Sequence, residues 1–464
     1  MIIKLKTLDR LLIRLLKVGP VARTSKYQFW LACFLASSGS LIADDGLING
    51  YIGAQTNQLN RDVGDVPGNR FNGNLGFDFQ KNRSDSQINQ IERRFTASAL
   101  MNDQSLLMYS VQEAYVGGHL TNKDTIRFGR QILDWSTLDA TWGFGKLNNR
   151  RNFDFFEPGQ EGLTGLNYER KSANGMRYKF FASGLYIPEL NPAFDINDNR
   201  GTIKSRHPWS DVPASSAMAN GSTLPINYDV NIPSYARIVY RYSVGANIGF
   251  ENKHWVFDNF IMRKPENGLS TKVTVDVDTF QNIINAKIVP QVYYHDIYGS
   301  TLKYRNEDIG MYVSAMAVRP NTFPDGSRQA TQYTDIKTEK RREDYMGGGI
   351  SRINSLYGYG FNYVARLSPF DRQKEQLALD PRWNQALNFF GLYNFGSKLT
   401  VSADLKFDML TTDRLIMARA FYNVTRNFLV NVGMNLIGTP EDGKSFWSPY
   451  TNNDSLYAGL RYIF

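Results

Sequence analysis

The chain has 464 residues, of which 13% are aromatic and one is cysteine, and its formal net charge is +9. The mean hydropathy of −0.39 resembles that of a soluble protein, and the chain has no apolar run of about 18 residues, so we expect no transmembrane helix. A membrane-spanning strand exposes only alternate residues to lipid, so this average does not exclude a membrane protein built of strands.

Residues 1–43 are predicted to be a secretory signal peptide. Basic residues precede a short apolar run from Phe29 to Ala36, and small residues then lead to an acidic start at Asp44. This is the usual order of regions in such a peptide. Cleavage is expected near Ala43, and the N-terminal part of the long leader is interpreted as a start-site artefact. The alternative is an amphipathic helix at a membrane surface.

Removing the leader changes the charge balance and the thiol content. The leader carries seven of the 53 Lys and Arg residues and one of the 44 Asp and Glu residues, which leaves 46 basic and 43 acidic residues. A net charge of +3 gives no reason to expect nucleic acid as a partner. The single cysteine, Cys33, is lost with the leader, which suits an oxidising periplasm.

The first strands are predicted from alternation with a period of two residues, the pattern of a half-buried strand. In the segment 72–80, Leu75 and Phe77 fall on one face and Asp78 on the other. The first strand is expected from Gly46 to Gln58. It should pair with the last strand, because lipid offers no hydrogen bonds and every strand in it needs a partner on both sides.

Two short motifs occur on adjacent predicted strands between residues 111 and 135. The run 113–115 reads Glu-Ala-Tyr, and the run 127–131 reads Arg-Phe-Gly-Arg-Gln. This combination resembles alginate-export-type and related large porin families over roughly two strands. The resemblance implies an outer-membrane barrel that passes a polysaccharide or small hydrophilic solutes. Arg130 falls on the apolar side of its strand, and we expect a bulge at Gly129 to turn it inward.

The segment 134–161 is the first long connection and the candidate for narrowing a pore. It combines aromatic residues with opposed charges. Aromatic faces near polar groups suit sugar rings, and opposed charges orient a dipolar solute. The alternative is a loop that packs its aromatic residues on the rim. The residues expected at the constriction are Trp142, Arg150, Arg151, Asp154 and Glu157.

Further strands alternate with long segments along the rest of the chain. Strands are predicted at 236–251, 271–278, 357–368 and 399–409, and long segments near 188–233, 321–342 and 439–453. Several strands reach about 10 residues, enough to cross a tilted bilayer, whereas ordinary strands have about 5–6. Short turns and longer external loops alternate in bacterial barrels. The basic run Lys337 to Asp344 is expected in an external loop, with the bridging of lipopolysaccharide phosphates as one possible role.

The C-terminal segment 457–464 has the form of a final strand. Leu460, Tyr462 and Phe464 share one face, and Gly459 is the fifth residue before Phe464. The segment resembles the terminal β-signal of outer-membrane proteins. This resemblance implies that Gly459, Tyr462 and Phe464 form an assembly signal, with the barrel-assembly machinery as a partner.

These patterns predict an all-β protein in which residues 44–464 form a single transmembrane, antiparallel, up-and-down β-barrel of about 18 strands, with 16–20 tolerated. The polar faces of the clearest strands would line a water-filled lumen of mixed charge. The residues expected to line the pore are Asp78, Arg127, Arg237, Arg241, Glu251, Lys272, Asp276, Asp278, Arg366, Asp404, Lys406, Asp408, Arg419 and Arg461.

The leading functional prediction is a porin of the bacterial outer membrane for small hydrophilic solutes, in contact with membrane lipid and lipopolysaccharide. One alternative is an export channel for a polysaccharide, although balanced lumen charges do not fit a polyanion. A second alternative is a plugged structural or enzymatic barrel. The four histidines show no metal-ligand spacing, so we expect neither catalysis nor a metal or other cofactor.

Overall fold

The computed structural model describes most of the chain beyond the predicted leader. The described residues are 47–59, 69–84, 90–102, 107–156, 158–189, 191, 194–197, 202–205, 207–210, 212–219, 221–321, 333–337, 340–368, 371, 381–440 and 445–463. The chain divides into the units Met1–Ile48 and Asn49–Phe464, and the fold described below is that of the second unit. The predicted signal peptide lies outside the described residues.

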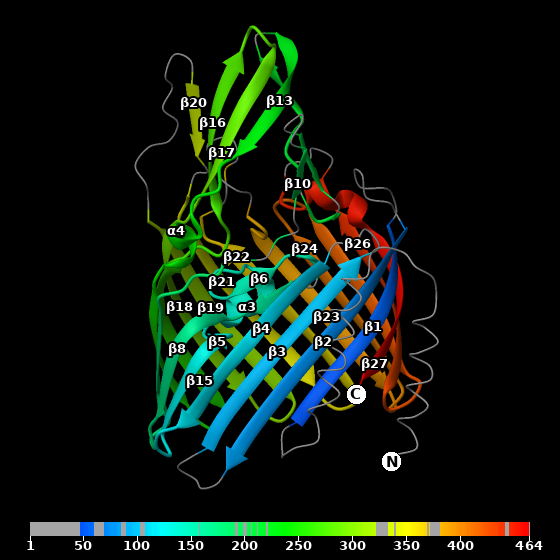
Figure 1. Cartoon of the computed structure of the whole chain (residues 1–464). Coiled ribbons are helices and arrows are strands. Elements are labelled where there is room, and N and C mark those ends of the chain that lie inside the picture. The colour runs from blue at the N-terminus through cyan, green and yellow to red at the C-terminus, as the bar shows by residue number, and fades with distance from the viewer. Residues whose placement is uncertain are drawn as a thin grey trace, which may run out of the picture. The chain divides into compact units, whose positions relative to one another are not determined.

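Eighteen antiparallel strands form one sheet (Figure 1). They are β1 (Leu47–Leu59), β2 (Asn69–Ser84), β3 (Gln90–Asn102), β4 (Leu107–His119), β5 (Asp124–Gln131), β8 (Leu163–Lys171), β9 (Met176–Ser183), β14 (Ser243–Glu251), β15 (Trp255–Pro265), β18 (Tyr294–Arg305), β19 (Ile309–Pro320), β21 (Glu343–Ile353), β22 (Tyr357–Arg366), β23 (Gln385–Phe395), β24 (Leu399–Asp408), β25 (Arg414–Asn423), β26 (Phe428–Gly438) and β27 (Ser455–Ile463).

Smaller elements occupy the connections between these strands. They are α3 (Thr137–Trp142), β6 (Asn149–Arg151), β7 (Gly159–Glu161), β10 (Phe194–Asn197), β11 (Thr202–Ser205), β12 (Ser216–Ala219), β13 (Ser222–Val230), α4 (Tyr235–Val239), β16 (Ser270–Asp278), β17 (Ile283–Gln291), β20 (Tyr333–Lys337) and the 3₁₀ helix η1 (Ser448–Asn453). Among the described residues, no helix is both long and apolar enough to cross a membrane.

The sheet closes into a barrel because its last strand pairs with its first. β27 and β1 are antiparallel, with a register that runs from Tyr51 opposite Ile463 to Leu59 opposite Ser455. Closure leaves no edge of unpaired backbone groups, which is the condition for spanning a bilayer with strands. The predicted fold class and strand number are therefore confirmed.

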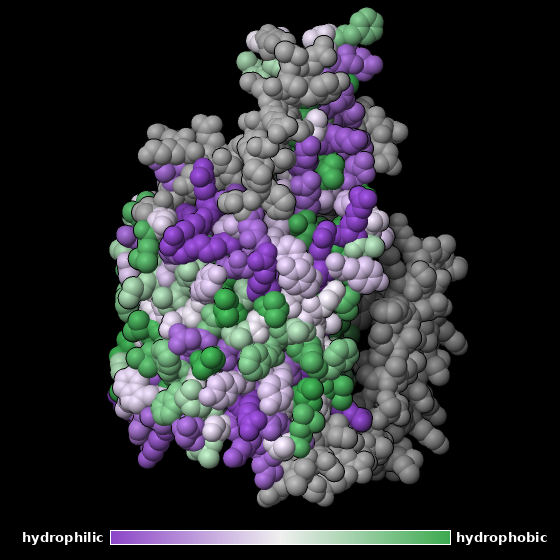
Figure 2. All heavy atoms as spheres, turned by 90° about the vertical axis from the view of Figure 1, so that its left-hand side faces the viewer, coloured by the Kyte–Doolittle hydropathy of each residue, from purple (hydrophilic) through white to green (hydrophobic). Residues whose placement is uncertain are grey.

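Alternate side chains of the barrel strands face outward and inward. In β15 the exposed and buried positions alternate from Trp255 onward, with Phe257 and Ile261 exposed and Met262 buried. The exposed set is apolar on strand after strand, and Figure 2 shows hydrophobic residues forming a band around the visible wall. An apolar outer wall around a partly polar interior is the pattern of a transmembrane barrel.

All long connections leave the barrel strands at the same end. They cover 132–162, 184–242, 266–293, 321–342, 367–384 and 439–454, whereas the turns at the opposite end that are described have three or four residues each, such as 252–254 and 424–427. The four long segments expected from the sequence fall within this set. The connections 266–293 and 367–384 were not anticipated.

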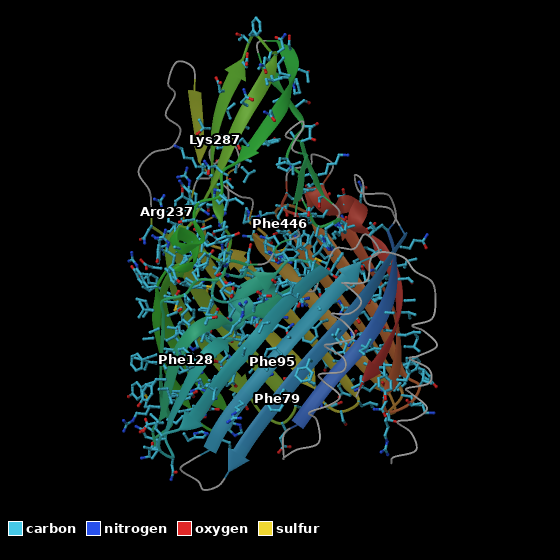
Figure 3. The ribbon with its side chains drawn as sticks, in the orientation of Figure 1. Phe79, Phe95, Phe128, Arg237, Lys287 and Phe446 are labelled. Atoms are coloured by element: carbon cyan, nitrogen blue, oxygen red, sulfur yellow. The ribbon has the colours of Figure 1, made fainter. Side chains whose placement is uncertain are left out.

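Two predicted barrel strands are wrong in part. The segment 271–278 is a strand, β16, but it belongs to a separate sheet of β12, β13, β17, β16 and β20. Alternation marks a half-buried strand without indicating which sheet it joins. The segment 236–251 begins with the short helix α4, and only its second half, β14, belongs to the barrel. Figure 3 labels Arg237, which belongs to α4, and Lys287, which belongs to β17, and both lie outside the barrel sheet.

The final strand has the two faces that the sequence indicates. Leu460 and Tyr462 are about half exposed on the outer wall, and Gly459 is buried on the inner wall, where it lies opposite Gln55 of β1. Phe464 lies outside the described residues. The role of this strand as an assembly signal stays a prediction.

Candidate functional site: the lumen and its infolded connection

The connection 132–162 contains the short helix α3, whose two ends are fixed by hydrogen bonds within the connection. The Ser136 side chain accepts a hydrogen bond from the Asp139 amide (3.1 Å), which caps the N-terminus of α3. Gly143 ends the helix with a φ of 65°, a conformation that glycine adopts without steric cost. The buried Asp139 carboxylate accepts hydrogen bonds from the amides of Lys146 (2.9 Å) and Leu147 (3.1 Å).

The apolar side of this connection packs against the inner wall of the barrel. Trp135, Leu138 and Trp142 are at most 2% exposed and share one apolar cluster with wall residues of β15, β18, β19, β21 and β22. On these strands the wall members of the cluster are Phe260, Met262, Ile297, Met316, Val318, Tyr345 and Val364, and β8, β9, β23, β25 and β26 add Leu163, Phe181, Ala386, Leu415, Met417 and Ile437. The connection therefore occupies part of the lumen instead of lying on the rim.

Arg382 joins several long connections above this packing. Its guanidinium lies 5.7 Å from the ring of Phe155, 5.7 Å from that of Phe446 and 5.0 Å from that of Trp447. It also donates hydrogen bonds to the carbonyl oxygens of Gly143 (3.0 Å) and Phe155 (2.6 Å). Burial and the nearby positive charge of Arg150 lower the pKa of Arg382 to about 9, so it remains protonated at neutral pH. Cation–π contacts are stronger when they are desolvated.

A buried ion pair fixes the end of the infolded connection to the wall. The Glu161 carboxylate, which is fully buried, accepts hydrogen bonds from Arg130 (2.7 Å) and Ser110. Arg130 therefore turns inward, as expected. The expected bulge in its own strand is wrong, because β5 pairs with β4 and β8 without a register shift. Gly129 has a φ of 128° and supplies the irregular backbone instead.

A second ion pair ties the connection to the opposite part of the wall. Lys146 lies 2.8 Å from Glu343, the first residue of β21. Burial opposes the charge on Lys146, but the attraction of Glu343 and neighbouring carboxylates outweighs it and raises the pKa of Lys146. Removing one partner of such a pair by substitution would leave the charge of the other partner buried without a counter-charge.

Two cavities lie along one part of the inner wall, and we call the larger of the two, whose lining is mostly polar, the polar lane. A cavity of about 370 Å³ lies between the connections and the inner faces of β25, β26, β27, β1, β2 and β3, and a second cavity of about 180 Å³ shares Tyr51, Ser98 and Arg461 with it. The polar lining of the larger cavity comprises Tyr51, Gln55, Asn57, Asn72, Asn74, Ser98, Arg151, Asp154, His207, Arg419, Asn431, Asn435, Asn453, Ser455, Tyr457 and Arg461.

Glycines on the inner wall let large side chains lie flat beside this lane. A Cβ added at Gly76 would overlap the ring of Tyr51, and one added at Gly433 would overlap the hydroxyl end of Tyr457. Both glycines lie on strands next to the tyrosines that cover them, β2 beside β1 and β26 beside β27. The tyrosines therefore occupy space at the wall instead of projecting across the lumen.

Two arginines contact Tyr51 and Ser98, which line both cavities. The guanidinium of Arg461 stacks on the ring of Tyr51 at 4.4 Å, and Arg151 of the infolded connection donates a hydrogen bond to Ser98. We call the group Tyr51, Ser98, Arg151 and Arg461 the lane junction. Both positive charges therefore lie beside side chains that line the two cavities.

The predicted pore-lining residues have several different positions. Asp78, Arg419 and Arg461 line the two cavities. Arg127 lies over the ring of Tyr115 at 5.6 Å, and Glu251 pairs with Arg177 (2.9 Å) and Arg305 (3.2 Å) at the end of β14. Asp404 accepts a hydrogen bond from Asn388 (2.8 Å). Lys406 is half-buried on the same face of β24 as Asp404.

The remaining predicted pore-lining residues require correction. Lys272, Asp276 and Asp278 lie on β16, which is not a barrel strand. Arg237 is exposed on α4, and Arg241 precedes β14. Arg366 is 5% exposed at the end of β22. Asp408 is 1% exposed and accepts hydrogen bonds from the amides of Asn384, Leu410 and Thr411, which fix a turn.

The residues expected at the constriction also fall into two groups, those that line a cavity and those that are buried. Arg151 and Asp154 line the larger cavity. Trp142 is buried against Trp383, with 5.9 Å between ring centroids, and Arg150 is buried and donates to the Asp139 carbonyl (2.8 Å). These two hold the connection in place and do not face the lane. Glu157 lies outside the described residues.

Sequence reasoning missed the asparagines of the lane and the anchor Arg382. The asparagines Asn74, Asn431 and Asn435 stand on inward positions of barrel strands, and alternation could have identified them if uncharged residues had been weighed. Arg382 follows the predicted strand 357–368 in a connection that was not recognised, and no pattern in the sequence links it to Phe155.

Comparisons with known proteins give a limited result. No family model matches the chain, and no curated protein matches it. An engineered variant of the porin of Rhodopseudomonas blastica is 11% identical, with a TM-score of 0.41 over 90% of this chain and 100% of that chain. A second variant is 12% identical, with a TM-score of 0.38 over the same shares. Neither match shows the alginate-export-type resemblance, and likeness of this degree carries no argument about function.

Proposed function

We propose that this protein is a porin of the bacterial outer membrane that passes small hydrophilic solutes by diffusion and catalyses no reaction. The proposal rests on the polar lane, a cavity of about 370 Å³ that lies beside the infolded connection on the inner side of the wall. Amides and hydroxyls along the lane can replace water around a solute.

The charges along the lane favour anions over cations. Arg151, Arg419 and Arg461 line the larger cavity together with Asp154 as its acidic residue, and Asp78 lines the smaller cavity. Fixed charges close to a narrow passage set ion selectivity more strongly than charges elsewhere in a lumen. We therefore expect a mild anion preference, in place of the neutral balance inferred from the sequence.

Conductance across planar lipid bilayers tests this proposal. The refolded full chain should form open channels, and a salt gradient should give a reversal potential with the sign of anion preference. The double variant Arg151→Gln and Arg461→Gln should shift that potential towards cation preference. Arg352→Gln is the matched control, because Arg352 is an exposed arginine on the outer wall, and it should change nothing.

A plugged barrel is the second candidate, and the apolar packing of the infolded connection favours it. A folded protein that gives no conductance in any bilayer would support the plugged barrel against the porin. Export of a polysaccharide is the third candidate. Block of the ionic current by oligosaccharides, but not by the corresponding monosaccharides, would support it.

A further inference from the structure

A group of arginines lies on the outer wall of the barrel, at the end where the long connections leave. Arg263 of β15 lies opposite Asp296 of β18, which lies opposite Arg319 of β19. Asp344 and the preceding Arg342 continue the row onto β21. The inward neighbours Met262, Ile297, Val318 and Tyr345 are buried in the lumen, so by alternation the charged residues point outward.

Carboxylates hold these arginines in a fixed arrangement. A guanidinium nitrogen of Arg263 lies 3.6 Å from a carboxylate oxygen of Asp296. The carboxylate oxygens of Asp344 lie 2.6 Å from a guanidinium nitrogen of Arg319 and 2.7 Å from one of Arg342. We call this group the rim belt; it comprises Arg263, Asp296, Arg319, Arg342 and Asp344. Its three arginines outnumber its two aspartates.

The guanidinium groups of the belt remain accessible. The side chains of Arg263, Arg319 and Arg342 are 44%, 30% and 66% exposed, although each has a carboxylate partner. Each of these planar groups presents several N–H donors, of which the carboxylate uses only a part. The belt therefore keeps both net positive charge and free donor positions towards the outside.

The position of the belt restricts what can reach it. Directly below it on the same strands, the outer wall is apolar, with Ile261, Tyr298, Val313 and Met346 each between 43% and 55% exposed. Figure 2 views the side of the barrel that carries α4 and β18, and it shows hydrophilic residues above the hydrophobic band. A molecule that fills both regions has a hydrocarbon part and an anionic head group.

We propose that the rim belt binds the phosphate groups of a lipopolysaccharide molecule in the outer leaflet. Arginine pairs with phosphate through two parallel hydrogen bonds, and basic residues at the membrane boundary attract anionic head groups. The rings of Tyr242 and Tyr294, which are tilted to each other with 5.0 Å between their centroids, lie beside the belt at the depth of the head groups. The proposal rests on the outer-membrane location proposed above.

Binding of purified lipopolysaccharide to the delipidated, detergent-folded protein tests the proposal, with native mass spectrometry as the readout. The double variant Arg263→Gln and Arg319→Gln should bind at least about tenfold more weakly, because each charged hydrogen bond contributes roughly the free energy of one such factor. Arg342→Gln removes the most exposed guanidinium of the belt and should weaken binding less. It serves as the second variant if the double variant does not fold.

The matched control is the double variant Arg305→Gln and Arg352→Gln, which removes two exposed arginines with carboxylate partners at the opposite end of the barrel. Equal weakening by this control, or unchanged binding by the belt variants, would overturn the proposal. Equal belt-dependent binding of phosphatidylglycerol would overturn the assignment to lipopolysaccharide. Bilayer conductance distinguishes the two proposals. A protein that conducts but does not bind the lipid contradicts only the rim-belt proposal. A protein that binds the lipid but does not conduct contradicts only the porin proposal.

Discussion

At the scale of single residues, glycine decides how wide the lane is. Gly76 lies under the Tyr51 ring, so Gly76→Ala forces the ring away from the wall and into the lumen. We expect a lower single-channel conductance and a loss of about 1–3 kcal/mol in unfolding free energy, the usual cost of overpacking. Gly391→Ala is the control, since an added methyl group there meets no atom closer than 4.0 Å. A full-sized conductance in Gly76→Ala would contradict the role given to this glycine.

At the scale of elements, the infolded connection is the part that limits the open area. An 18-stranded barrel without a filling element has a lumen wide enough for a water-filled channel. Replacing 137–158 by a short Gly-Ser linker removes α3 and its apolar packing, so single-channel conductance should rise severalfold while the wall strands remain. Circular dichroism checks that the barrel folds. Unchanged conductance in a folded barrel would show that the connection does not narrow the passage.

At the scale of the whole molecule, the apolar wall predicts how deeply the barrel sits in a bilayer. Ile248 is 49% exposed near the middle of β14, whereas Tyr242 lies at the rim and is 50% exposed. Ile248→Arg should cost about 2–4 kcal/mol and Tyr242→Arg about 0–1 kcal/mol, because the penalty for a charge falls from the midplane to the interface. Reversible unfolding by guanidinium in lipid vesicles measures both. Equal costs at the two positions would place the bilayer elsewhere.

The sequence was sufficient for the barrel because strands, turns and closure each leave a local pattern. Alternation identified β14, β22 and β24, and the last strand pairs with the segment expected to be first. The same pattern misplaced β16, since strands of a sheet outside the barrel also have one apolar face. Local patterns therefore specify the type of element more reliably than its partner.

The candidate site was less predictable because its members come together only on closure. Tyr51 and Arg461 are near opposite ends of the chain, yet they stack at the lane junction. Charged residues were preferred over asparagine when the lining was predicted, so the amides of the lane were missed. Asp408 was predicted to line the pore, but its carboxylate accepts hydrogen bonds from backbone amides. Such local engagement is common for aspartate at turns.

The sheet formed by the connections has a consequence for the surface that faces away from the membrane. β13 pairs in parallel with β17, and β16 pairs with both β17 and β20, so three successive connections share one set of backbone hydrogen bonds. Cutting the polypeptide between any two of these strands would leave the severed pieces attached. An antibody or phage that recognises this sheet binds an epitope composed of several separate segments of the chain, and no single peptide taken from the chain would reproduce it.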